Sequence, residues 1–120
     1  MHARIRPPAR LLLTALLASS AMLLSSGIPL RAAEPQTVEV RITDYRFEPA
    51  ELTIRVGTTV RWINAERRTS HSILLHGEHG FESERFFPDE HFEHRFDVPG
   101  VYTYGCGPHT EMHGEIVVVE

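Results

Sequence analysis

A thiol, an imidazole and a thioether follow one another at intervals of three residues near the carboxyl end of the chain. They belong to Cys106, His109 and Met112. Three glycines and a proline accompany them within residues 102–114, and these residue types allow sharp turns. The backbone can therefore bring the three side chains together at one point. This segment is the first candidate for a metal site.

A second imidazole completes a recognisable set. His71 follows the apolar run at residues 60–64, on what we expect to be a neighbouring strand or loop. The set His71, Cys106, His109 and Met112 matches a trigonal copper site of two imidazoles and one thiolate, with a weak axial thioether. Thiolate and thioether favour Cu(I), and imidazole serves both oxidation states. We therefore predict a copper site with these four ligands.

Other interpretations of these residues have less support. Zinc binds Cys and His, but it ordinarily completes its shell with Cys, His or carboxylate and not with Met. A nucleophile made of Cys106 and His109 would need an oxyanion hole and a substrate pocket, and nothing in the sequence supplies either. Met112 could instead fill the core, and His76 is the rival of His71 as second imidazole. His71 is preferred because an apolar strand continues after it.

The remaining histidines and the acidic residues are interpreted as surface. His91 and His94 are three apart in a predicted strand, which places them on opposite faces. These two, with His76, His79 and His113, could form a second metal site, but we favour solvated surface imidazoles. A further group of carboxylates predicts a solvated acidic face that could steer a basic partner. It comprises Glu82, Glu84, Asp89, Glu90 and Glu93.

Composition excludes several classes of protein. A chain of 120 residues allows one domain at most. Its single Cys cannot form an internal disulfide or, in a monomer, a four-thiolate zinc or iron–sulfur site. All 12 basic residues are Arg, and 16 carboxylates bring the net charge to −4. The acidic excess argues against a nucleic-acid binder, whose binding surface would be basic.

The first 33 residues differ from the rest. They hold four of the arginines and no carboxylate, and a cationic stretch at 1–10 precedes an apolar run at 11–24. This pattern predicts a secretory signal that is cleaved between residues 27 and 33, with Ala33 favoured. The alternative is an uncleaved membrane anchor over residues 11–30. Cleavage at Ala33 would leave one domain, residues 34–120, with 16 carboxylates against eight arginines and a net charge of −8.

Apolar residues alternate with polar ones through most of this domain. The alternation predicts short strands, separated by turn signals such as Pro99-Gly100, near residues 38–42, 52–56, 60–62, 71–75, 91–98, 101–104 and 115–119. Residues 76–90 show too little pattern to assign and could be a short helical turn or a loop. Seven to eight short strands predict an all-β fold, an antiparallel Greek-key sandwich or barrel.

In combination, these pieces resemble the cupredoxins, the small blue copper proteins, and most closely their amicyanin and pseudoazurin branch. The resemblance spans Thr37–Glu120 and includes Phe47-Glu48-Pro49 and Trp62-Ile63-Asn64. The Cys-x-x-His-x-x-Met spacing, with Pro before His, is similar to that of amicyanins. Two features depart from the pattern. Ser72 stands where many cupredoxins have an Asn that ties the two ligand loops together, and Thr110-Glu111 replaces more apolar residues beside the exposed His.

The resemblance implies a cupredoxin-like fold with one copper ion per chain. His71, Cys106 and His109 would bind it in the equatorial plane, with Met112 axial and His109 as the exposed edge. It implies an electron carrier and not an enzyme, exported to the periplasm, whose partners are redox proteins such as a dehydrogenase, a c-type cytochrome, or a copper oxidase or reductase. The alternative is a periplasmic copper chaperone or copper-resistance protein. We expect a monomer, without membrane insertion once the signal is removed.

Overall fold

The structure is a computed structural model that describes residues 25–28 and 34–120. The predicted signal segment and the alternative anchor therefore lie outside the described residues, except for the exposed residues 25–28. Within the described part of the chain, no helix is long and apolar enough to cross a membrane.

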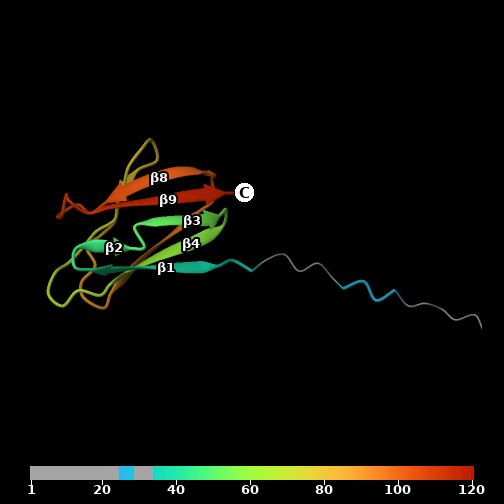
Figure 1. Cartoon of the computed structure of the whole chain (residues 1–120), viewed down its shortest axis with the longest axis horizontal. Coiled ribbons are helices and arrows are strands. Elements are labelled where there is room, and N and C mark those ends of the chain that lie inside the picture. Colours follow the sequence, from blue (N-terminus) through green and yellow to red (C-terminus); the bar gives the residue numbers. More distant parts are fainter. Residues whose placement is uncertain (1–24, 29–33) are drawn as a thin grey trace, which may run out of the picture. The chain divides into compact units, whose positions relative to one another are not determined.

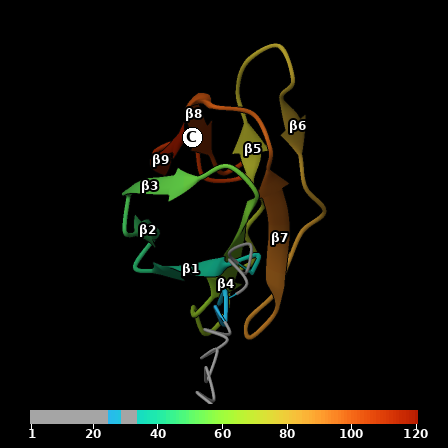
Figure 2. The same cartoon turned by 90° about the vertical axis from the view of Figure 1, so that its right-hand side faces the viewer.

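Nine strands form two sheets between residues 37 and 119 (Figures 1 and 2). The four-stranded sheet has the order β2-β1-β4-β7, and its strands are β1 (Thr37–Thr43), β2 (Arg46–Glu48), β4 (Thr58–Asn64) and β7 (His91–Phe96). The five-stranded sheet has the order β3-β9-β8-β5-β6, with β3 (Glu51–Arg55), β5 (Leu74–Leu75), β6 (Phe81–Glu82), β8 (Gly100–Gly105) and β9 (His113–Val119). The predicted all-β, two-sheet architecture is confirmed.

The expectation of purely antiparallel pairing is wrong. β1 and β4 pair in parallel, with Val40 opposite Trp62, and β3 and β9 pair in parallel, with Ile54 opposite Val118. The chain leaves the four-stranded sheet after β2, forms β3 in the other sheet, and returns as β4. Such a crossover connection allows two strands of one sheet to run in the same direction.

Three very short strands raise the count above the predicted seven or eight. β2 has three residues, whereas β5 and β6 have two each. The predicted strand at 71–75 is reduced to β5 and an isolated bridge between His71 and Phe86. Segment 76–90, left open by the sequence, contains β6. Two or three residues hold barely one period of alternation, so hydrophobic pattern cannot reveal them.

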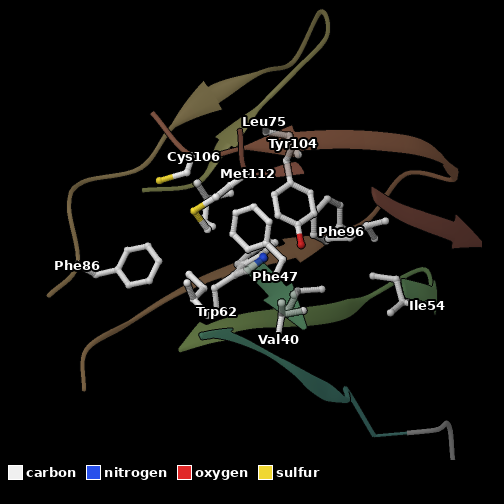
Figure 3. Close-up of a cluster of buried hydrophobic side chains, with 14 of the residues drawn as sticks. Val40, Phe47, Ile54, Trp62, Leu75, Phe86, Phe96, Tyr104, Cys106 and Met112 are labelled. Carbon is white, nitrogen blue, oxygen red and sulfur yellow. The ribbon is translucent and has the colours of Figure 1, made fainter. Parts of the chain in front are cut away.

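The core fills the space between the two sheets and reaches one end of the sandwich. Every second residue of β4 is buried, from Thr58 to Asn64, as expected of a strand with one face in the core. The Tyr104 ring packs on Phe47 and Trp62, with ring centroids 4.6 and 5.4 Å away. Figure 3 shows Cys106 at the edge of this aromatic cluster. The candidate metal site therefore adjoins the aromatic part of the core.

Candidate metal centre

Three of the four predicted ligands converge on one point. The Cys106 Sγ lies 3.6 Å from Nδ1 of His71 and 3.6 Å from Nδ1 of His109. One ligand atom from each residue lies within 4.8 Å of the others. A thiol has a single proton to donate, so it cannot donate a hydrogen bond to both rings at once. One thiolate facing two ring nitrogens is the donor set of a trigonal copper site.

Different parts of the fold supply these side chains. Cys106 directly follows β8, and His109 lies in the short loop between β8 and β9. His71 is held by its two-way backbone pairing with Phe86, whose hydrogen bonds measure 3.1 and 2.9 Å. Figure 1 shows that the loop before β9 and the loop after β4 lie at the end of the sandwich opposite the C terminus. His71 and Cys106 are 35 residues apart in the sequence, and they meet because both loops lie at this end.

Met112 lies beside the same point. Its side chain is 2 % exposed, and its backbone N–H donates to the carbonyl of His109 at 3.1 Å, which closes the loop as a tight turn. The sulfur atoms of Met112 and Cys106 lie at the same end of the core (Figure 3). The position suits a weak axial thioether, the fourth donor of the predicted set.

His71 is prepared for metal binding by its surroundings. It is completely buried, and its second ring nitrogen, Nε2, has no hydrogen-bond partner among the described residues. Burial lowers the pKa of His71, and the neighbouring His109 lowers it further, while the carboxylate of Glu66 acts in the opposite direction. The lowered pKa favours the neutral ring, and a neutral imidazole keeps a lone pair on one of its two nitrogens for a metal ion.

Asn64 and Glu66, which were not predicted from the sequence, hold the segment around His71 in place. The buried amide of Asn64 donates to the carbonyls of Thr69 and Phe86, at 2.8 and 3.1 Å, and accepts the N–H of Glu66 at 3.0 Å. Glu66 in turn accepts the backbone N–H of Tyr45 at 2.8 Å. A signal for Asn64 was available, because a polar residue occupies a core-facing position of β4. No comparable signal marks Glu66.

Tyr45 partly covers the site from outside. Its ring meets the His109 ring edge-on, with centroids 4.9 Å apart, and lies 6.0 Å from the His71 ring. The tyrosine itself is 46 % exposed. His109 is half-buried, and Cys106 and His71 are buried. Among the three converging residues, His109 is thus the one that reaches the surface, although Tyr45 shields part of it.

Ser72 ties the two ligand loops together, although many cupredoxins have an Asn at this position. Its hydroxyl accepts the N–H of Gly107 at 3.0 Å, and its own N–H donates to the Cys106 sulfur at 3.4 Å. The same hydroxyl donates to Glu82 at 2.9 Å. Ser72 therefore joins the His71 segment to the Cys106 segment. Glu82, which the sequence placed on a merely solvated acidic face, takes part in this link.

The expectation of solvated histidines is wrong for His94. That ring packs against Phe81 and Phe96, with centroids 4.7 and 4.8 Å away, and burial lowers its pKa against the opposing effect of Asp97. His91 is exposed on the same strand. Within residues 25–28 and 34–120, the only group of three His, Cys, Asp or Glu side chains close enough to share a metal is His71, Cys106 and His109.

Comparison with known proteins agrees with this geometry. Residues 35–119 match the family described as copper binding proteins, plastocyanin/azurin family. The chain belongs to this family. The predicted resemblance to cupredoxins is confirmed, and copper is the metal that the donor set fits.

Relatives place this plastocyanin/azurin family member near the amicyanins. Amicyanin-alpha of Methylorubrum extorquens is 29 % identical over 110 residues, which cover 88 % of this chain and 92 % of the relative. Amicyanin of Paracoccus denitrificans is 33 % identical, with 78 % and 75 % covered. A putative pseudoazurin of Rhizobium leguminosarum bv. viciae is 31 % identical, with 88 % and 71 % covered.

Solved structures show the same likeness. The reduced form of an amicyanin variant has a TM-score of 0.65 at 29 % identity and covers 73 % of this chain and 86 % of its own. A copper-containing nitrite reductase of Thermus scotoductus has a TM-score of 0.67 at 30 % identity. The match covers 78 % of this chain but only 24 % of the reductase, so the likeness concerns one part of that enzyme.

Proposed function

We propose that the protein is a type 1 copper electron carrier. In this proposal, the Cys106 thiolate, the Nδ1 atoms of His71 and His109, and the Met112 thioether would hold the copper. The observation that supports it most strongly is the 3.6 Å approach of the Cys106 sulfur to both ring nitrogens. The bound copper supplies a one-electron change between Cu(I) and Cu(II).

The contribution of the chain is to keep these donors in place while the charge changes. The N–H of Ser72 faces the Cys106 sulfur, and a hydrogen bond to a thiolate sulfur fixes its direction and tunes its electron density. His71 is immobilised by complete burial and by its backbone bridge to Phe86. Ligands that cannot move need little rearrangement on electron transfer, which favours a fast carrier.

His109 is the proposed point of electron entry and exit, because it is the least buried of the three converging residues. The proposed partners are redox proteins: a dehydrogenase, a c-type cytochrome, or a copper oxidase or reductase. Thr110 and Glu111 are exposed directly after it, so the partner would meet polar side chains beside the ring. We further propose that residues 1–33 export a monomeric domain, residues 34–120, to the periplasm.

Copper titration followed by absorption spectroscopy and voltammetry tests the function. Wild-type protein is expected to bind one Cu(II) with an intense visible thiolate-to-copper band and to cycle reversibly. Cys106→Ser should lose the band, Met112→Leu should keep it with a shifted potential, and the surface control His79→Gln should match wild type. A band that survives in Cys106→Ser would refute the ligand assignment. Several bound coppers, or Cu(I) release without reversible cycling, would instead support a copper chaperone.

A further inference from the structure

We propose that Glu82 is a positioning residue of the copper site, which braces the Cys106 loop through Ser72 and lowers the reduction potential through its negative charge. This inference rests on the proposed type 1 copper function. Glu82 is not one of the proposed ligands. It acts through Ser72 and the backbone of Gly107.

The direction of the hydrogen bonds is determined by the chemistry of the hydroxyl. Ser72 Oγ accepts the N–H of Gly107 at 3.0 Å and has one proton of its own to donate. The remaining partner is Glu82 Oε1, at 2.9 Å, and a carboxylate oxygen is an acceptor. Ser72 is completely buried, so its hydroxyl is shielded from water. The hydroxyl is therefore held in one orientation between the loop and the carboxylate.

A second, independent observation places Glu82 against the copper loop itself. A Cβ added to Gly107 would overlap the Oε1 atom of Glu82 and come within 2.8 Å of Ser72 Oγ. The carboxylate thus fills the space that a side chain at position 107 would need. Gly107 directly follows Cys106. Because it has no side chain, the Glu82 carboxylate can lie against the loop.

The sheet brings Glu82 to this place. β6 pairs with β5 so that Glu82 lies opposite Leu74, and β5 pairs with β8 so that Leu74 lies opposite Gly105. Glu82, Leu74 and Gly105 are therefore aligned across three neighbouring strands, and Gly105 directly precedes Cys106. β6 has only two residues, and the brace gives this short strand a specific role.

The charge has a predictable effect on the redox equilibrium. A negative charge near the metal stabilises Cu(II), the more positive state, relative to Cu(I). Ser72 directly follows the proposed ligand His71, and its N–H faces the Cys106 sulfur. The hydroxyl of the same residue contacts the Glu82 carboxylate, so Ser72 alone separates the carboxylate from the thiolate. Glu82 is exposed, so solvent weakens the interaction without removing it.

Glu82→Gln isolates the charge, because the amide oxygen can still accept the Ser72 proton. At neutral pH we expect the variant to bind copper with the wild-type visible band. Its equilibrium ratio of Cu(I) to Cu(II) should be about three- to tenfold higher than that of wild type, which corresponds to a reduction potential higher by roughly 30 to 60 mV. The matched control is Glu84→Gln. It removes the same charge from an exposed residue two positions away and should shift the ratio by less than about twofold.

Glu82→Ala and Ser72→Ala isolate the brace. In the reduced, diamagnetic protein, hydrogen exchange at the Gly107 amide should be fastest in Ser72→Ala, accelerated in Glu82→Ala, and close to wild type in Glu82→Gln. The expected acceleration is at least about tenfold for the first variant, because the amide loses its acceptor. Far-ultraviolet circular dichroism checks that each variant is folded.

The outcomes separate this inference from the proposed function. If the wild-type protein forms no visible thiolate-to-copper band, the copper function itself fails. If the band forms but Glu82→Gln shifts the potential no more than Glu84→Gln does, the charge effect is refuted. If exchange at Gly107 is the same in Glu82→Ala and wild type, the brace is refuted.

Discussion

The carboxylate of Glu66 faces the second ring nitrogen of His71, with Oε1 3.8 Å from Nε2. The side chain of Glu66 is only 14 % exposed, and that of His71 is fully buried. Metal-binding histidines commonly present their second nitrogen to a carboxylate, which fixes the ring and makes the ligand more basic. At this distance the carboxylate does not hydrogen-bond to Nε2, so Glu66 acts on His71 through its charge, while the opposite ring nitrogen, Nδ1, faces the Cys106 sulfur.

Replacing this carboxylate should weaken the metal site. We expect Glu66→Ala to lower the affinity for copper by about 10- to 100-fold, the usual effect of removing the outer partner of a histidine ligand. Competition with a chelator measures it. Glu39→Ala serves as the control, because Glu39 is an exposed residue of β1 paired with Arg61. An affinity equal to that of the control would show that Glu66 does not support His71.

The buried amide of Asn64 should matter for stability. Asn64→Ala removes three hydrogen bonds and leaves the carbonyls of Thr69 and Phe86 without this donor. A hydrogen bond contributes about 1 kcal/mol net, so we expect the loss of three to lower the free energy of unfolding by about 2 to 3 kcal/mol. Urea denaturation measures the change. A loss below about 0.5 kcal/mol, the range of ordinary surface substitutions, would contradict this role.

Gly114 is required by the ring of Tyr104. A Cβ at position 114 would overlap that ring, since the two residues are opposite each other in β9 and β8. We expect Gly114→Ala to reduce the free energy of unfolding by about 1 to 3 kcal/mol through overpacking. The same substitution in a Tyr104→Leu background should have a smaller effect, because the obstructing ring is gone. Equal losses in both backgrounds would exclude the proposed clash.

Partial burial of His94 should make the metal-free protein sensitive to acid. Its pKa is lowered from 6.5 in the folded state, so the folded form binds fewer protons than the unfolded form as the solution becomes acidic. The contribution of neutral His94 is fully present above about pH 6.5 and is lost as the pH falls through the lowered pKa. His94→Phe should therefore lose less stability than wild type between pH 7.5 and 5.5.

Urea denaturation of the metal-free proteins at several pH values measures this difference. His71, whose pKa is also lowered by burial, contributes to both proteins and cancels in the comparison. The exposed His91 provides the control, and His91→Gln should follow the wild-type pH dependence. Identical pH dependence of His94→Phe and wild type would rule out a contribution from His94.

The all-β class and the four candidate ligands could be predicted from local sequence patterns. Alternation of apolar and polar residues is a local property, so it located strands such as β4 and β9, whose lengths span several periods. The spacing of Cys106, His109 and Met112 is local as well, since one short loop carries all three. His71 could be added because its residue type completes a known donor set.

The pairing of the strands and the surroundings of the ligands could not be predicted in this way, because both depend on the folded chain. The parallel pairs β1 with β4 and β3 with β9 depend on where the chain crosses between sheets, and alternation looks the same in either direction. Glu66 and Glu82 look like ordinary surface carboxylates in the sequence. Their roles arise because folding places Glu66 beside His71 and Glu82 beside Ser72. Contacts between residues far apart in the chain are products of packing, and no local pattern records them.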